Sequence, residues 1–288
     1  MKYSLNLLFL SFLFQISAQN LVPNPSFEEF SQCPDQLNQV PYATGWSSFG
    51  STPDYYNACN YSSLFNSEVY AVPDNYYGFQ YAAEGSAYCG LISWQGDGSN
   101  IREMIGAELI TPLDSGITYF VSLKFNFPYR EGNPCWNTAI KNLGVRFTNF
   151  QYSENSPHPV DDSCHVCSNQ LIMDTLNWIE VSGTFIPDQQ YNYIVIGNFY
   201  SDATTDTMML FAPFNCGNCS SYYVDEICVS TNSLTCGNKP AGLVENTSME
   251  KQLIRIVDIM GRETDYSPNT LLIYIFSDGT TEKVFRVE

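Results

Sequence analysis

Ten cysteines spread over residues 33–236 constrain this chain more than any other feature of its sequence. They are Cys33, Cys59, Cys89, Cys135, Cys164, Cys167, Cys216, Cys219, Cys228 and Cys236. An even number of cysteines in an exported chain predicts a framework of disulfides, although sequence alone cannot choose the pairing. If the chain is exported, we therefore expect a cross-linked extracellular domain.

The first 19 residues have the pattern of an export signal. Lys2 precedes the apolar run 5–16, and the small residues Ser17 and Ala18 follow it. The run is too short to span the ~30 Å hydrocarbon core of a membrane, but its length suits a signal peptide. We predict cleavage after Ala18 or Gln19, with a buried helix as the alternative. Since no later stretch has the length of a membrane span, we expect a secreted or outer-cell-surface protein.

Two pairs of cysteines have a spacing that also occurs in zinc sites. Cys164 and Cys167 form one C-x-x-C pair, and Cys216 and Cys219 form another. Four thiolates would complete a tetrahedral zinc site, but 48 residues separate the pairs and an oxidising compartment favours disulfides. We therefore expect disulfides rather than zinc. A thioredoxin-like role is weaker still, because neither pair lies at a strand-to-helix turn.

The charge balance excludes some partners and divides the chain. Twelve Lys and Arg face 30 Asp and Glu, for a net charge of -18. So few cations cannot form the basic face that nucleic acid requires. Residues 20–250 hold 6 basic and 24 acidic residues, whereas residues 251–288 hold 5 and 6. We therefore divide the chain into a signal peptide (1–19), a cysteine-rich domain (20–236), a linker (237–250) and a C-terminal module (251–288).

The cysteine-rich domain has the pattern of β structure. Short runs rich in β-branched and aromatic residues are bounded by Gly, Pro, Asn and Asp, notably at 118–125, 179–185, 193–199 and 222–229. Helical periodicity is scarce, and the best candidate for a helix is Asn100–Leu109. Several short strands in one domain predict an all-β sandwich or barrel.

Motifs at both ends of this domain carry a family resemblance. In order they are residues 20–28 (NLVPNPSFE), Gly45-Trp46, Pro112-Leu113 with 116–119, Trp178 with 181–185, and 223–227 (YVDEI). The set resembles the galactose-binding-like jelly roll of carbohydrate-binding modules, particularly the form in secreted Bacteroidetes surface proteins. The resemblance covers roughly residues 20–235 and implies a jelly-roll β-sandwich that binds a glycan or another extracellular ligand.

The C-terminal module carries a separate resemblance. Apolar and polar residues alternate over 253–263 up to a Gly turn, and 271–276 and 283–287 supply two further strands. This is similar to the C-terminal sorting domain of the type IX secretion system, which shares the D-x-x-G-R turn but has additional proline-containing strands that are absent here. The resemblance implies the secretion machinery as a partner. The alternative is a structural hairpin that completes the domain.

The jelly-roll resemblance also implies a structural calcium ion near the chain ends. It places candidate ligands at Glu28 and Asp225. Calcium takes six to eight oxygen ligands, which carboxylates from two strands and backbone carbonyls can provide. The alternative is that both carboxylates face solvent or cap turns.

Sugar recognition uses aromatic rings that stack on apolar sugar faces, together with side chains that form directional hydrogen bonds. The candidates in loop-like segments are Trp94, Tyr129, Arg130, Trp136 and Asn137. Trp46 and Trp178 occupy motif positions that favour the core. Since a sandwich needs buried aromatic residues anyway, each candidate also has a purely structural reading.

Catalysis has less support in the sequence than binding. The two histidines, His158 and His165, lie beside prolines or cysteines, and no nucleophile-elbow or His-Glu-x-x-His motif occurs. Glycoside hydrolysis needs two carboxylates at a suitable separation, and no pair is singled out. We therefore expect a noncatalytic binding protein. The alternatives are a polysaccharide-acting hydrolase and a structural adhesin or matrix protein that binds a protein partner.

Overall fold

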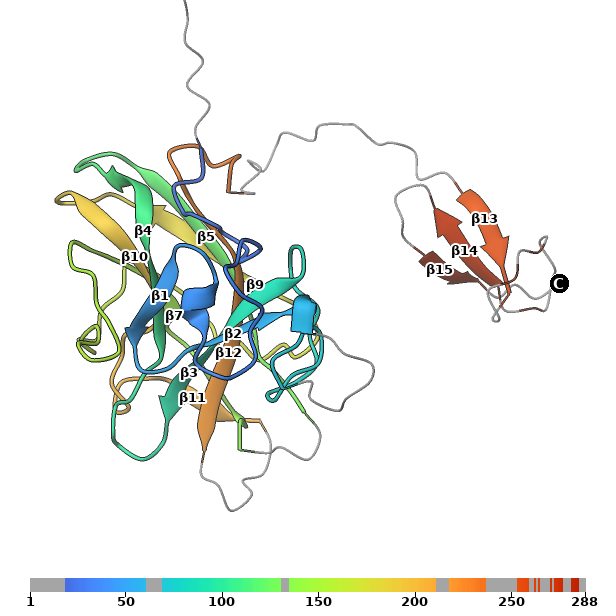
Figure 1. The fold of residues 1–288 in the computed structure, drawn as a ribbon, viewed down its shortest axis with the longest axis horizontal. Coiled ribbons are helices and arrows are strands. Elements are labelled where there is room, and N and C mark those ends of the chain that lie inside the picture. Colours follow the sequence, from blue (N-terminus) through green and yellow to red (C-terminus); the bar gives the residue numbers. More distant parts are fainter. Residues whose placement is uncertain are drawn as a thin grey trace, which may run out of the picture. The chain divides into compact units, whose positions relative to one another are not determined.

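The computed structural model describes residues 19–60, 69–130, 135–210 and 218–236, and in the tail 253–258, 262, 264, 270, 272–276 and 281–284. The chain divides into two compact units, Met1–Asn238 and Lys239–Glu288. Figure 1 shows the first unit as layered β-sheets and the second as a small sheet of three strands. No helix in these described ranges is long and apolar enough to cross a membrane.

Two five-stranded antiparallel sheets build the first unit. One sheet contains, in spatial order, β1 (Trp46–Gly50), β4 (Met104–Leu113), β10 (Tyr191–Asn198), β7 (Leu143–Thr148) and β8 (Val166–Cys167). The other contains β2 (Asp54–Asn57), β3 (Ala87–Gln95), β12 (Cys219–Ser230), β5 (Tyr119–Asn126) and β9 (Ile179–Phe185). The short strands β6 (Thr138–Ile140) and β11 (Thr207–Met209) form a separate pair, and η1 (Val40–Tyr42) and η2 (Ala58–Asn60) are 3-10 turns. The predicted all-β sandwich is confirmed.

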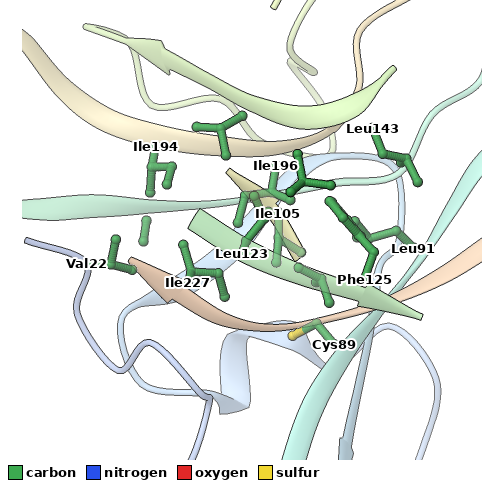
Figure 2. Packing of buried hydrophobic residues seen from close by; sticks show 14 of the residues in the cluster. Val22, Cys89, Leu91, Ile105, Leu123, Phe125, Leu143, Ile194, Ile196 and Ile227 are labelled. Atoms are coloured by element: carbon green, nitrogen blue, oxygen red, sulfur yellow. The ribbon is translucent and has the colours of Figure 1, made fainter. Parts of the chain in front are cut away.

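The main hydrophobic core lies between the inner faces of the two sheets. Figure 2 shows side chains of both sheets meeting there, among them Leu91, Leu123 and Phe125 from one sheet and Ile105 and Ile194 from the other. All five are fully buried. Because successive side chains of a strand point to opposite faces, alternate positions of each strand supply this layer. Truncating Phe125 to alanine would cost about 3–5 kcal/mol of stability.

The motifs at the two ends of the domain lie side by side. The amide of Leu21 donates to the carbonyl of Val229 at 2.7 Å, and the Leu21 carbonyl accepts from the amide of Ile110 at 2.9 Å. The Asn20 side chain donates to the carbonyl of Ile227 and accepts from the amide of Val229. Since Val229 belongs to β12 and Ile110 to β4, the N-terminal segment connects the two sheets.

Each sheet also buries aromatic side chains on its outer face, under a long loop. Residues 69–86, here called the β2–β3 loop, cover a cluster of Tyr56, Val72, Tyr77, Tyr88 and Tyr223. Residues 149–165, here called the β7–β8 loop, cover a cluster of Phe49, Met104, Val195 and Phe199, with Tyr152 and Val160 packed against it. The outer faces are therefore occupied by chain.

One expected element is wrong. The proposed helix at Asn100–Leu109 is instead largely strand β4, Met104–Leu113. This strand is paired with β1 on one side and β10 on the other. Pairing on both sides, with buried residues at its centre, outweighs the weak local preference of the segment for a helix.

The expected disulfides are present in the cysteine-rich unit. They join Cys33 to Cys59, Cys164 to Cys167, and Cys228 to Cys236. Cys135 is also disulfide-bonded, whereas Cys89 and Cys219 are free thiols; Cys216 lies outside the described residues. Burial of Cys89 in the sandwich core raises the pKa of its thiol, so this group remains protonated and unreactive.

The second unit consists of β13 (Leu253–Val257), β14 (Leu272–Phe276) and β15 (Thr281–Val284) in an antiparallel sheet. An ion pair closes the turn after β13, because Arg262 donates to the Asp258 carboxylate from its Nε atom at 2.9 Å and from its backbone amide at 3.0 Å. The Asp and Arg of the D-x-x-G-R motif thus hold the ends of the turn together.

Candidate functional site

The candidate site is a groove on the β2–β3 loop with a volume of about 510 Å³. We call it the aromatic groove, and it is lined by Ala58, Val72, Pro73, Asp74, Phe79, Tyr81, Ala82, Gly85 and Ser86. Its size falls within the range of about 300–1,000 Å³ that is typical of small-ligand pockets. Most of the lining is apolar, which suits the apolar face of a ring-shaped ligand.

Exposed aromatic rings concentrate around this groove. Phe79 and Tyr81 are 56% and 66% exposed, and their rings meet edge to face with centroids 5.5 Å apart. Tyr76 and Tyr129 nearby are 47% and 45% exposed. The other exposed aromatic residues among those described are Phe30 and Phe150. Burying such rings in a ligand contact is favourable, so the three rings of the β2–β3 loop, with Tyr129 beside them, form a candidate binding surface.

Asn75 anchors the β2–β3 loop from below. It is 1% exposed, and its side chain donates to the Tyr88 hydroxyl at 2.9 Å and accepts from the Tyr223 hydroxyl at 2.6 Å. Its side-chain oxygen also accepts from the amide of Tyr77 at 3.1 Å. Tyr88 and Tyr223 belong to the central strands of the sheet. The loop is therefore fixed to the sheet directly beneath its exposed rings.

Further hydrogen bonds hold the segment that carries Phe79 and Tyr81. The Trp178 indole donates to the carbonyl of Tyr81 at 2.9 Å, and the Tyr88 hydroxyl donates to the carbonyl of Gln80 at 3.0 Å. The amide of Gln80 donates to the carbonyl of Pro73 at 2.7 Å. With its backbone held this way, the loop presents its rings without a large ordering cost on binding.

Two carboxylates hold the end of the loop. Asp225 accepts from the amides of Ala83 at 2.8 Å and Glu84 at 3.1 Å. Glu28 accepts from the amides of Ser86 at 2.7 Å and Ala87 at 2.9 Å. Asp225 is fully buried, and burial raises its pKa to about 8 in spite of its hydrogen bonds to backbone amides.

These contacts bear on the predicted calcium site. Glu28 and Asp225 accept hydrogen bonds from different amides of one short segment, residues 83–87. In the described part of the chain they join no set of three or more acidic, His or Cys side chains suited to a metal. A calcium ion there would have to take most of its ligands from backbone carbonyls and water. The observation in favour is the burial of Asp225, because burial raises the pKa of its carboxyl and a neighbouring cation would favour the charged form.

The groove contains a carboxylate whose charge is balanced by an ion pair. Among its described lining residues, Asp74 is the one with a charged side chain, and it forms an ion pair with Arg130. Arg130 also donates to the carbonyl of Asn75 through Nε at 3.1 Å and through a terminal nitrogen at 2.5 Å. The guanidinium group thus braces the loop and balances the charge of Asp74.

The structure separates the five residues that the sequence proposed for ligand binding. Tyr129 and Arg130 lie against the β2–β3 loop. The backbone of Tyr129 is so close to Gly78 that a Cβ atom added at this glycine would lie only 2.8 Å from the Tyr129 carbonyl oxygen. Trp94 lies near the end of β3 and packs against the main core. It therefore belongs to a strand and not to the expected loop.

Trp136 and Asn137 lie near the start of β12. The Trp136 ring contacts Tyr77 with centroids 4.8 Å apart and packs against the outer cluster. Asn137 is fully buried and donates to the side chain of Asn218 at 3.3 Å. The indole nitrogens of Trp94 and Trp136 are buried without a hydrogen-bond partner. Trp94 and Trp136 contact the main core and the outer cluster respectively, and neither lines the aromatic groove.

Sequence reasoning missed Phe79, Tyr81 and Tyr76. A signal was present, because residues 74–81 (DNYYGFQY) place four aromatic side chains between Pro73 and Gly85. Such density in a segment bounded by turn residues is unusual for a solvated loop. The expectation that Trp46 is core is confirmed at 3% exposure, whereas Trp178 is partly buried and packs beside Tyr88.

Two buried acids, Asp54 and Glu103, have raised pKa values, a property that catalytic acids often share. Burial raises the pKa of Asp54 to about 6 and the pKa of Glu103 well above its usual value. Both side chains are at most 3% exposed; Asp54 accepts from the amide of Asn38 and Glu103 from the amide of Ile92. Neither lines the aromatic groove. Their carboxylates hold the backbone at Asn38 and Ile92 in place.

No protein-family model and no curated protein matches the chain. Among solved structures, it is similar to the CBM22-1 xylan-binding domain of Xyn10C from Paenibacillus barcinonensis, with 11% identity, a TM-score of 0.34, and coverage of 71% of this chain and 90% of that one. It is also similar to the K1 cleaved adhesin domain of Lys-gingipain from Porphyromonas gingivalis, with 10% identity, a TM-score of 0.34, and coverage of 72% and 96%.

Proposed function

We propose that the first unit is a noncatalytic carbohydrate-binding domain and that the aromatic groove is its binding site. The observation that carries the proposal is the pair of exposed rings, Phe79 and Tyr81, on a loop fixed to the sheet by Asn75. Aromatic rings provide a rigid apolar surface on which the face of a sugar ring stacks, and edge polar groups orient its hydroxyls. The Asp74 carboxylate and the Ser86 hydroxyl line the same groove.

The test is binding to a panel of polysaccharides by the wild type and by Phe79→Ala and Tyr81→Ala. We expect each variant to lose at least about tenfold in affinity for any polysaccharide bound, which corresponds to about 1.4 kcal/mol of lost ring contact. The matched control is Phe150→Ala, because Phe150 is 70% exposed but belongs to the β7–β8 loop. Calorimetry gives the affinities, and thermal unfolding checks that the variants fold.

Variants of Trp94 and Trp136 test the location of the site. If the ligand lies in the aromatic groove, Phe79→Ala and Tyr81→Ala should weaken binding more than Trp94→Ala or Trp136→Ala do in folded protein. The reverse order would move the site to the start of β12. Binding to no polysaccharide, or binding unaffected by all four changes, would reject the proposal.

For the whole chain, we propose export followed by sorting through the type IX secretion system to the outside of the cell. The support is the apolar run behind Lys2 and the resemblance of the tail, whose Asp258 and Arg262 close its turn. Deletion of residues 251–288 should leave the protein in the periplasm. Cell fractionation measures this, and unchanged delivery to the surface would reject sorting by the tail.

A structural calcium ion beside Asp225 is part of the same proposal. Its role would be to stabilise the end of the β2–β3 loop, where Asp225 holds the amides of Ala83 and Glu84. The ion would act on the stability of the binding surface and would take no part in contacting the sugar.

A further inference from the structure

We infer that the aromatic groove selects uncharged glycans and rejects anionic ones such as polyuronides and sulfated polysaccharides. The inference rests on the proposed function and adds the chemical class of its ligand. It depends on three observations: the pairing of every cation in the sandwich, the neutral lining of the groove, and the acidic excess around it.

Every cationic Lys or Arg side chain between residues 19 and 236 is already paired with a carboxylate. This range contains five such residues, and all five lie in described parts of the chain. The pairs are Arg102–Asp202, Lys124–Glu226, Arg130–Asp74, Lys141–Asp206 and Arg146–Asp161. Lys141–Asp206 is the loosest, at 3.4 Å with Asp206 69% exposed. An anionic ligand would have to compete with one of these carboxylates for its cation.

The groove offers no net charge to a ligand. Asp74 is the charged side chain among its described lining residues, and Arg130 neutralises it. Arg130 is further engaged by the carbonyl of Asn75. A guanidinium group that is free to make paired hydrogen bonds is the preferred donor for carboxylate groups, and lysine can bind anions as a point charge. Here the Arg130 guanidinium already binds the Asp74 carboxylate and the carbonyl of Asn75.

The rest of the domain repels anions. Residues 19–236 hold 22 Asp and Glu against the five Lys and Arg. Unpaired carboxylates on this scale produce a negative potential that lowers the local concentration of anionic ligands, and salt screens it over a Debye length of about 10 Å at 0.1 M. A neutral glycan is not subject to this repulsion, and ring stacking on Phe79 and Tyr81 does not need charge.

The test compares derivatives of one polymer. A neutral polysaccharide that binds is carboxymethylated on one sample and hydroxyethylated to the same degree on another, so that the substituents differ mainly in charge. We expect the carboxymethyl form to bind at least about tenfold more weakly than the hydroxyethyl form at about 0.01 M salt, with the gap narrowing towards about 1 M salt. Equal or tighter binding of the anionic form would overturn the inference while leaving carbohydrate binding in place. Binding of no polymer would reject both.

A pair of variants locates the effect at the groove. Asp74→Asn removes the carboxylate that neutralises Arg130, and Asp206→Asn makes the same change in net charge at the Lys141 pair. We expect Asp74→Asn to raise the ratio of anionic to neutral affinity by about threefold to tenfold, because the net charge of the Asp74–Arg130 pair then changes from zero to +1 beside the ligand. Asp206→Asn should change the ratio less than twofold. Equal effects of the two variants would contradict a selective role for the groove.

Discussion

The two loops that cover the outer faces of the sandwich have the same structural task but different surfaces. Both bury aromatic side chains against a sheet, in clusters around Tyr223 and Phe199 respectively. The β2–β3 loop also presents Tyr76, Phe79 and Tyr81 to solvent, whereas the β7–β8 loop exposes only Phe150 among the aromatic residues described there. One buried layer of aromatic side chains is therefore enough to cover a sheet. The exposed rings of the β2–β3 loop are not needed for this packing.

The loops also differ in the groups that hold them. The β2–β3 loop is held by the carboxylate of Asp225 and the amide of Asn75. The β7–β8 loop is held in part by two imidazole rings. The His158 ring packs against Tyr152 and Phe199 with centroids 4.8 Å and 5.2 Å apart, and the His165 ring stacks on Phe185 with centroids 4.2 Å apart. Burial raises the pKa of Asp225 and lowers the pKa of His165, so the stability contributions of these two groups change with pH in opposite directions and the two loops can be perturbed separately.

The largest expected effect is that of Asn75→Ala. The change leaves the buried Tyr223 hydroxyl without its acceptor and removes a donor from the Tyr88 hydroxyl, which still donates to the carbonyl of Gln80. The free energy of unfolding should fall by about 2–4 kcal/mol. Because the same side chain fixes the loop, carbohydrate binding should fall as well. Chemical denaturation and calorimetry measure the two effects.

The β7–β8 loop supplies the contrast for this variant. Tyr152→Ala removes a ring that packs on Phe49 and His158, so it should lower stability but leave glycan affinity unchanged. If Asn75→Ala weakened the fold without weakening binding, the ligand would not lie on the β2–β3 loop.

Calcium should produce the next largest effect. If an ion lies beside Asp225, saturating calcium should stabilise the folded state by about 2–3 kcal/mol at a hundredfold excess over the dissociation constant, and a chelator should remove this increment. Thermal unfolding with calcium or with chelator measures the shift. Asp225→Asn should unfold at a lower temperature and show no response to calcium. An identical melting temperature in calcium and in chelator would leave Asp225 as a loop anchor alone.

The strands were predictable because their signals are local. The predicted run 179–185 coincides with β9, and 222–229 lies within β12. Asn100–Leu109 failed because its structure is decided by partners in β1 and β10. Local residue preferences do not encode such partners.

The candidate site was less predictable because exposure is decided by distant contacts. The sequence placed Tyr129 and Arg130 in a loop-like segment, but Arg130 meets a loop 55 residues away and Asp225 holds a segment about 140 residues away. Whether a tryptophan in a polar stretch faces solvent or the core depends on such contacts. Trp94 follows an apolar run, and the strand simply continues through it.

The smallest effect is expected from the imidazoles of the β7–β8 loop. Burial, with Arg146 nearby, lowers the pKa of His165 to about 4, whereas an unfolded histidine titrates near 6.5. The unfolded state therefore takes up a proton first as the pH falls. The stabilising contribution of neutral His165 is complete above about pH 6.5 and is lost progressively between about 6.5 and 4. Asp225, with its raised pKa, contributes in the opposite sense, since its contribution is lost as the pH rises towards about 8.

His165→Phe isolates the imidazole. A phenyl ring keeps the stacking on Phe147 and Phe185 but loses the hydrogen bond from the amide of Phe147 at every pH. Relative to the wild type, the variant should therefore gain roughly 1 kcal/mol of stability between pH 7 and pH 4.5, after allowance for the partial exposure of the ring. Urea unfolding at a series of pH values measures this difference. A difference that stays constant with pH would show that His165 does not change its protonation state on unfolding.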